Sequence, residues 1–259
     1  MEPVYASVIG LIKTAFRAYS WPITVRGAEH VPSAGGAVLA TNHIGYLDFT
    51  FVGYAAGKRG RLVRFLAKKE IFDKPGVGWL MRGMRHVPVD RYGRAADSYS
   101  AALTALQAGE VIGMFPEATI STSFVPASGK TGAARMAMAA GVPLVPGAVW
   151  GSQRILTKGR SRNLQRGVAI TVLFGSPIPY TPGEDPAAVT KRLMTRITEL
   201  VAEAQATYPQ QPDSDDDRWW VPAHLGGTAP SMAQSNAAAR TVSAERRAQR
   251  RSRNRTASP

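Results

Sequence analysis

The sequence lacks cysteine altogether, and it contains only four histidines among 259 residues. The absence of cysteine excludes disulfide bonds, thiolate metal sites and covalent catalysis through a thiol. The histidines are scattered along the chain, and none of them has a close spacing that suggests zinc. They are His30, His43, His86 and His224. We therefore expect no metal site.

Long apolar segments are also missing near the N-terminus. The apolar run at residues 4–12 has nine residues, whereas a membrane-spanning helix needs roughly 20. The run also lacks the basic start and the small-residue cleavage site of a secretory signal. Because Lys13 and Arg17 follow it, residues 1–22 are predicted to form an amphipathic helix. Such a helix either packs on the domain or lies flat on a membrane, and the sequence leaves both open.

Acidic residues are few compared with basic ones. The chain has 18 Asp and Glu against 32 Lys and Arg, which gives a formal net charge of +14. The excess is large at residues 58–94, which hold 11 basic and 3 acidic residues. A positive field of this kind attracts nucleic acid, an anionic lipid surface or phosphorylated small molecules. Because no basic and aromatic binding module accompanies the charge, a nucleic-acid partner is not expected.

Apolar segments that are typical of strands alternate with helix-like segments between residues 23 and 207. This alternation predicts a single α/β domain with a mostly parallel or mixed sheet flanked by helices. The expected strands are Ile23–Arg26, Ala37–Thr41, Leu62–Ala67, His86–Asp90, Val111–Phe115, Leu144–Trp150 and Val168–Phe174. The expected helices within this domain are Tyr46–Ala56, Ala95–Ala108, Thr131–Ala140 and Pro186–Thr207.

The composition changes near Tyr208. Residues 209–259 are rich in Pro, Ser, Ala, Gln, Asp and Arg, and residues 240–255 hold seven arginines against one glutamate. Because so little apolar surface is available to join a core, residues 208–259 are predicted to form a disordered tail. Trp219 and Trp220 could dock onto the domain or a membrane, but the composition favours a solvated tail.

A histidine and an aspartate lie five positions apart just after an expected strand. If a helix begins between them, Asp48 can reach back to one imidazole nitrogen of His43 and leave the other to accept a proton. A second carboxylate, Glu117, also follows an expected strand, as does Arg91. Because strand ends of an α/β sheet gather side chains at one edge, we expect these groups to lie on one face.

Taken together, four blocks of the chain resemble the glycerolipid (lysophospholipid) acyltransferase family, that of the 1-acyl-sn-glycerol-3-phosphate acyltransferases. The resemblance covers roughly residues 20–200, and the blocks occur in the family's order at compatible intervals. They are Asn42-His43 through Asp48 (the HxxxxD motif), Gly83-Met84-Arg85-His86-Val87-Pro88-Val89-Asp90-Arg91, Phe115-Pro116-Glu117-Ala118-Thr119 and Val142-Pro143-Leu144-Val145-Pro146.

The resemblance implies an O-acyltransferase of phospholipid biosynthesis. His43, oriented by Asp48, would deprotonate the free hydroxyl of 1-acyl-glycerol-3-phosphate (lysophosphatidic acid). That oxygen would attack the thioester of acyl-CoA or acyl-carrier protein without an acyl-enzyme intermediate, which would produce phosphatidic acid. The family implies no cofactor beyond this co-substrate. It also implies peripheral binding to an anionic membrane surface, at the cytoplasmic face of the cell membrane.

The resemblance also implies a set of substrate-binding residues. Arg91 and Lys130 would bind the acceptor phosphate, and Glu117 would order or bind the acceptor. Ala118 and Thr119 belong to the same block as Glu117. Ala118 would leave space beside the scissile carbonyl, where backbone donors could stabilise the oxyanion.

Two positions depart from the family pattern. The family usually has glycine and arginine where this chain has Ala118 and Ile120. The missing guanidinium removes a bidentate phosphate ligand. The sequence therefore leaves a second class of acceptor open, namely glycerol 3-phosphate, another lysophospholipid or an amino-lipid.

Overall fold

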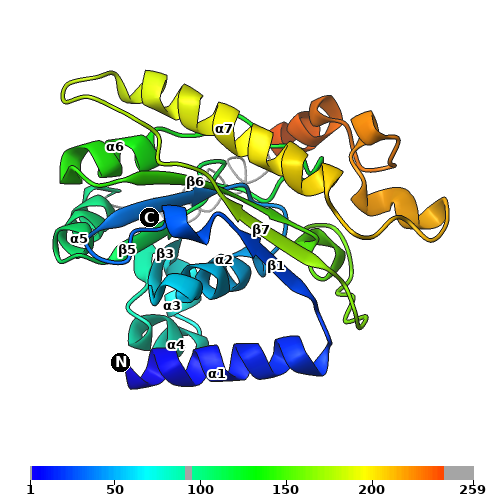
Figure 1. Ribbon diagram of the computed structural model, residues 1–259, viewed down its shortest axis with the longest axis horizontal. Helices are drawn as coiled ribbons and strands as arrows, with labels where there is room; N and C mark the ends of the chain where they lie inside the picture. The colour runs from blue at the N-terminus through cyan, green and yellow to red at the C-terminus, as the bar shows by residue number, and fades with distance from the viewer. Residues whose placement is uncertain (1, 91–94, 242–259) are drawn as a thin grey trace, which may run out of the picture.

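The computed structural model describes residues 2–90 and 95–241, which are built around a seven-stranded sheet (Figure 1). The strand order is β1-β7-β6-β2-β5-β3-β4. Neighbouring strands are parallel except for β6 and β7, so the sheet is mixed and the predicted α/β class is confirmed. The strands are β1 (Ile23–Arg26), β2 (Ala37–Thr41), β3 (Val63–Lys68), β4 (Val87–Val89), β5 (Val111–Met114), β6 (Leu144–Trp150) and β7 (Ile170–Phe174).

Strands β2, β6 and β7 are buried along their whole length. Strands that are covered on both faces have nearly continuous apolar sequences. This property makes the segments recognisable in the sequence, and all seven predicted strands are present with ends that differ by at most two residues.

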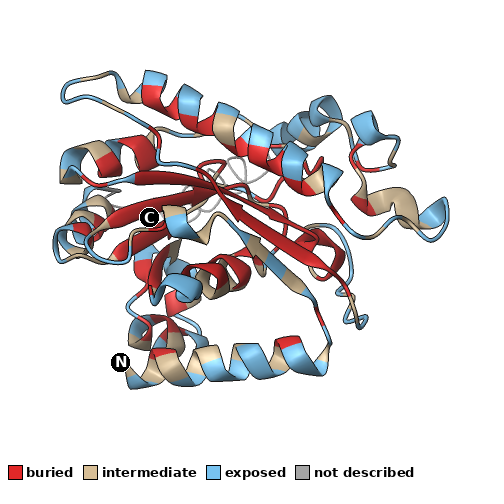
Figure 2. Cartoon of the chain, in the orientation of Figure 1, coloured by how far each residue is buried: buried red, intermediate tan, exposed pale blue. Residues whose placement is uncertain are grey.

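Helices cover both faces of the sheet and bury two large apolar clusters (Figure 2). Alternate residues of β2 point to opposite faces, so that Val38 packs in one cluster and Leu39 in the other. One face carries α5 (Ala95–Gln107), α6 (Gly132–Ala140) and α7 (Pro186–Ala206); the other carries α2 (Asp48–Ala56) and part of α1 (Pro3–Ala18). The short helices α3 (Lys69–Phe72) and α4 (Val77–Gly83) are absent from the sequence prediction.

The long helix α7 illustrates how the sequence determines these elements. Asp185 accepts a hydrogen bond from the backbone N–H of Ala187 and thereby caps the helix N-terminus. Val189, Leu193 and Ile197 recur at four-residue spacing and are fully buried. One apolar face therefore holds the helix on the sheet.

Helix α1 is attached to the domain near both of its ends. At the start, the Tyr5 hydroxyl donates to the carbonyl of Val63 (2.8 Å), and Glu2 pairs with the buried guanidinium of Arg64. At the end, Phe16 is buried against α2. Leu11, between these attachments, is 71% exposed. No helix in the described part of the chain combines the length and apolarity needed to cross a membrane.

The segment after Tyr208 differs from the predicted disordered tail over the residues that the structure describes. Residues 208–241 contain the short helices η4 (Asp216–Trp220) and η5 (Ala223–Leu225) and a final helix that begins at residue 232. Trp220 is buried in the main apolar cluster with Tyr208, and the ring of Trp220 lies 4.5 Å from the guanidinium of Arg154. A few aromatic contacts thus dock a segment whose average composition is polar. Residues 242–259 lie outside the described part.

Candidate functional site

The candidate site lies at the carboxyl ends of adjacent parallel strands. Strands β2 and β5 are paired in register, with Ala40 opposite Met114. The chain therefore delivers His43, which follows β2, and Glu117, which follows β5, to the same edge of the sheet. Ligands and chemistry in open α/β sheets are found at this edge.

His43 and Asp48 form the predicted hydrogen-bonded pair. The imidazole Nδ1 lies 2.8 Å from Oδ2 of Asp48. Asp48 is the first residue of α2, so its carboxylate also receives the backbone N–H groups of Ile44 (2.8 Å) and Gly45 (2.9 Å). Asp48 is fully buried, whereas 19% of the His43 side chain is exposed. The carboxylate thereby orients the ring and leaves Nε2 as the nitrogen for a substrate.

The imidazole of His43 is also held by an aromatic stack. Its ring lies almost parallel to that of Phe115, with centroids 4.0 Å apart. Phe115 in turn stacks at 6.1 Å on Phe65, a residue of β3. Apolar rings thus form a continuous wall from the histidine to the neighbouring strand.

Glu117 connects the two loops of the site through its carboxyl group. Oε1 accepts the backbone N–H of His43, and Oε2 accepts that of Ala127, both at 3.0 Å. Burial raises the pKa of Glu117 to about 7, although the two backbone hydrogen bonds and His43 oppose the shift. With both oxygens engaged by the main chain, Glu117 has the geometry of a residue that orders the site. Its direct contact with an acceptor stays a prediction.

The remaining predicted residues have different surroundings. Ala118 adopts a φ of +56°, which fits the family's glycine at this position. Thr119 is exposed and Ile120 is buried. Lys130 is exposed, and its backbone N–H donates to Pro116 (2.9 Å), next to Glu117.

The second block of the resemblance is only partly visible in the structure. Arg91 lies outside the described residues, so its predicted contact with a phosphate stays a prediction. Within residues 2–90 and 95–241, no three His, Asp or Glu side chains gather in a way that could hold a metal ion.

The sequence interpretation missed one residue that touches the pair. The hydroxyl of Ser152 donates to Oδ1 of Asp48 from the turn after β6. Strand β6 is the parallel neighbour of β2 on the side opposite β5. A serine just past a buried strand was a weak signal, and only the strand order places it beside Asp48.

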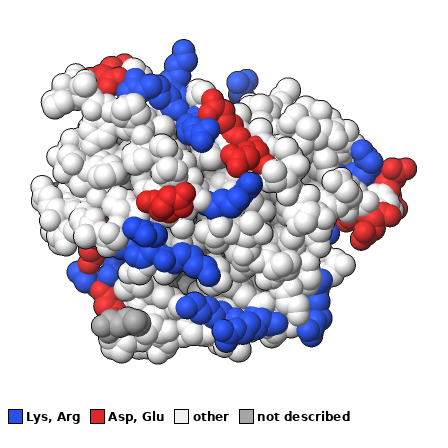
Figure 3. All heavy atoms as spheres, viewed as in Figure 1, with Lys and Arg blue, Asp and Glu red and all other residues white. Residues whose placement is uncertain are grey.

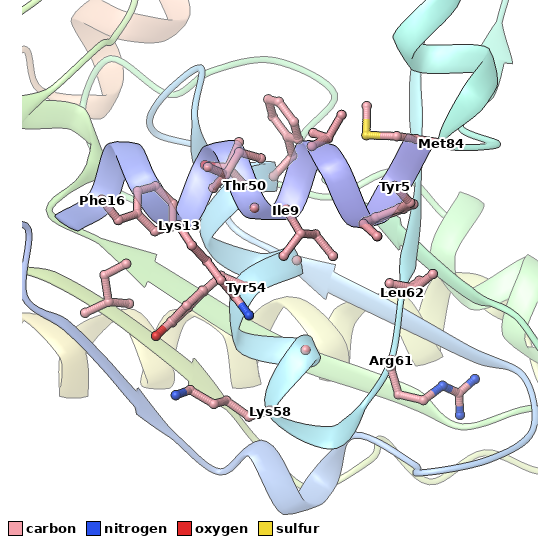
Figure 4. Close-up of a pocket in the computed structure, with 18 of the residues that line it drawn as sticks. Tyr5, Ile9, Lys13, Phe16, Thr50, Tyr54, Lys58, Arg61, Leu62 and Met84 are labelled. Carbon is pink, nitrogen blue, oxygen red and sulfur yellow. The ribbon is translucent and has the colours of Figure 1, made fainter. Parts of the chain in front are cut away.

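A large cavity of about 1040 Å³ lies between α1 and the domain (Figure 4). Tyr5, Ile9 and Phe16 line it from α1, and Thr50 and Tyr54 line it from α2. Phe65 is also part of the lining, so the cavity extends to the aromatic wall that backs His43.

The rim of this cavity is basic. Lys13 and Arg17 line it from α1, and Lys58 lines it from the opposite side. Arg61 also lines the cavity, but its guanidinium is buried and donates to the carbonyls of Pro32, Gly35 and Gly109. Figure 3 shows basic side chains on both sides of a hollow in this face. An apolar interior with cationic groups around it suits an amphiphile that carries a negative charge.

Comparison with known proteins agrees with this geometry. The model of the Acyltransferase family matches residues 22–150. The 1-acyl-sn-glycerol-3-phosphate acyltransferase of Bacillus subtilis is 29% identical over 187 residues, which cover 69% of this chain and 87% of that protein. The chain belongs to the acyltransferase family. The matched region contains His43, Asp48 and Glu117 and ends before Ser152 and the C-terminal segment.

Two further matches extend the comparison. The chloroplastic 1-acyl-sn-glycerol-3-phosphate acyltransferase LPAT1 of Arabidopsis thaliana is 31% identical over 161 residues. That alignment covers 61% of this acyltransferase but only 44% of the plant protein. The crystal structure of PlsC, the 1-acyl-sn-glycerophosphate (LPA) acyltransferase of Thermotoga maritima, superposes with a TM-score of 0.63 at 24% identity. The superposition covers 80% of this chain and 83% of the other, and it shows a shared fold.

Proposed function

We propose that this acyltransferase moves an acyl chain from a thioester to the free hydroxyl of 1-acyl-glycerol-3-phosphate, which forms phosphatidic acid. The observation that carries the proposal is the His43–Asp48 pair, with Nδ1 bonded to the buried carboxylate. The Bacillus subtilis relative, of which this chain covers 87%, is named for this acceptor. The pair supplies the base that such a hydroxyl needs.

The proposed reaction is a direct transfer. Nε2 of His43 takes the proton of the acceptor hydroxyl while the oxygen attacks the thioester carbonyl. The tetrahedral intermediate then expels the thiolate, which receives the proton from the imidazolium, so that a new ester and a free thiol result. Asp48 stabilises the imidazolium between the two steps. The chain has no cysteine that could carry the acyl group.

The cavity beneath α1 is the proposed place for an acyl chain. Its volume of about 1040 Å³ is ample for one chain, since drug-sized ligand pockets measure roughly 300–1,000 Å³. Phe65 lines the cavity and stacks on Phe115, which in turn stacks on His43. An acyl chain bound in the cavity would place its carbonyl end near the imidazole of His43.

The proposed phosphate ligands are Arg91 and Lys130. Lys130 is supported by its position, because its backbone is bonded to the loop that carries Glu117. Ile120 is buried where the family has arginine, which keeps glycerol 3-phosphate, other lysophospholipids and amino-lipids as the alternative acceptors. The donor in either case is acyl-CoA or acyl-carrier protein.

We further propose that the enzyme binds anionic membranes peripherally, at the cytoplasmic face. Two helices that pack together, α1 and α4, carry large exposed apolar side chains. Leu11 is 71% exposed and Trp79 is 63% exposed. Basic residues of α1, Lys13 and Arg17, lie close by in the sequence. Apolar insertion combined with attraction to anionic lipid is how amphipathic surfaces bind membranes.

An acceptor panel tests the proposed function. The purified full chain is incubated with labelled oleoyl-CoA, or with oleoyl-carrier protein, and with each acceptor in turn. The proposal predicts that the specificity constant is highest for 1-acyl-glycerol-3-phosphate. A higher constant for glycerol 3-phosphate, another lysophospholipid or an amino-lipid would establish the alternative, and the absence of transfer to every acceptor would contradict both.

A further inference from the structure

Ser152 completes the hydrogen bonding of Asp48. Oδ2 of Asp48 receives the imidazole of His43 and two backbone N–H groups, while Oδ1 receives the Ser152 hydroxyl. Both Asp48 and Ser152 are fully buried. The described residues thus give this carboxylate four donors, and Ser152 is the donor on the oxygen that faces away from the histidine.

We propose that Ser152 is a positioning residue of the acyl-transfer reaction, which acts by fixing the carboxylate of Asp48 against His43. The proposal rests on the proposed function, since it assigns Ser152 a role in the same pair. A buried carboxylate oxygen that has no donor is unfavourable. Without the serine hydroxyl, Asp48 would turn Oδ1 towards another donor, and the bond to the imidazole would weaken.

The burial of Ser152 excludes a more familiar role for a serine in an enzyme. A hydroxyl that nucleophilically attacks or binds substrate must reach the site's open space. Ser152 has no exposed surface, and its hydroxyl is directed to Asp48. The residue therefore acts through the aspartate and does not touch the substrate.

The turn that carries Ser152 is rigidly placed. Gly151 has a φ of +95°, and a Cβ at that position would lie 2.1 Å from the carbonyl oxygen of Ala169, so only glycine fits. On the other side, a Cβ on Gly45 would lie 3.0 Å from the hydroxyl oxygen of Ser152. The turn is thus packed directly against the loop between His43 and Asp48.

The C-terminal segment braces this turn from outside. The side-chain amide of Gln153 accepts the N–H of Gly151 (2.9 Å) and donates to the carbonyl of Trp220 (3.3 Å). Arg154 stacks on the ring of Trp220 and donates to the hydroxyl of Tyr208. These contacts connect Ser152 to residues 208–220, which lie beyond the region matched by the family model.

The test compares Ser152→Ala with Thr157→Val. Thr157 is a matched control, because its buried hydroxyl also bonds to the same loop, at the carbonyl of Ile44 (2.6 Å), but does not touch Asp48. We expect Ser152→Ala to lower kcat about 10- to 100-fold, because the free energy of a hydrogen bond to a charged group corresponds to about this factor, with both KM values within about 2-fold. Thr157→Val should leave kcat within about 2-fold.

A spectroscopic readout separates this proposal from the proposed function. The downfield proton resonance of the His43 Nδ1–H, assigned by its loss in His43→Ala, reports the bond to Asp48 directly. We expect it to shift or broaden in Ser152→Ala and to persist in Thr157→Val. Equal kcat values and unchanged resonances in both variants would overturn the positioning role. If the wild type transfers no acyl group, the proposed function fails, and the resonance alone still decides the role of Ser152.

Discussion

Glu117→Gln should change how the stability of the protein depends on pH. The pKa of Glu117 is about 7 in the folded protein, against an ordinary value of 4.5. At about 1.4 kcal/mol per pH unit, this difference amounts to about 3 kcal/mol. Because Glu117 is only 8% exposed, solvent screening reduces this free energy only slightly. Glutamine has nearly the same shape and does not titrate.

The sign follows from which state holds the proton. Below pH 4.5 both the folded and unfolded states are protonated, and the contribution is fully present. Between pH 4.5 and about 7 the unfolded state is ionised while the folded state keeps its proton, so the free energy of unfolding falls as the pH rises. Relative to Glu117→Gln, the wild type should therefore lose up to about 3 kcal/mol between pH 5 and pH 8.

Urea unfolding of both proteins at pH 5, 6, 7 and 8 measures this difference. The comparison with the variant is necessary because His86, whose pKa burial lowers to about 4, contributes with the opposite slope on the acid side. A constant difference for Glu117→Gln would refute the reasoning. A wild type that gains stability with pH would mean that the two backbone N–H donors outweigh burial.

Three further predictions concern the cavity, the C-terminal segment and the membrane. A Cβ on Gly53 would touch only Phe65, at 3.8 Å, so Gly53→Leu should fill the cavity and shift the preferred donor to shorter acyl-CoA chains. The control Ala101→Leu, on the exposed face of α5, should leave the preferred chain length unchanged. An unchanged chain-length profile in Gly53→Leu would contradict the proposed acyl site. A chain that ends at Tyr208 should lose about 3–5 kcal/mol of unfolding free energy in urea, the usual cost of removing a buried tryptophan. A chain that ends at residue 241 keeps every described contact and is the control. Equal stability of the two would show that the docking of the C-terminal segment is unimportant. Co-sedimentation with anionic vesicles should weaken with salt and with Trp79→Ala, and equal binding to neutral vesicles would argue against the membrane surface.

The strands were predictable because each is a short segment rich in apolar residues, and β2, β6 and β7, which are buried along their whole length, are nearly continuously apolar. Helices α3 and α4 were not, because they span only four and seven residues and leave no amphipathic period to read. The docking of residues 208–241 was missed for a different reason. A polar composition lowers the average burial, but it does not prevent one side chain such as Trp220 from joining the core beside Arg154.

Some contacts of the candidate site could be predicted from the sequence, and others could not. The His43–Asp48 bond could be predicted because five positions of chain, ending in a helix start, bring the two together locally. The link between Glu117 and His43 needed the additional inference that their strands are neighbours. Ser152 could not be assigned, because its contact with Asp48 spans 104 positions and depends on the place of β6 in the sheet.

Acyl transfer by His43→Ala, compared with wild type and Asp48→Asn, tests the central claim most directly. Initial rates are measured with saturating oleoyl-CoA and 1-acyl-glycerol-3-phosphate, and circular dichroism confirms that each variant is folded. Loss of a general base usually costs about 10²–10⁴-fold, so His43→Ala should retain at most about 1% of the wild-type rate, and Asp48→Asn should retain more. A folded His43→Ala protein that turns over at nearly the wild-type rate would contradict the assignment of His43 as the base.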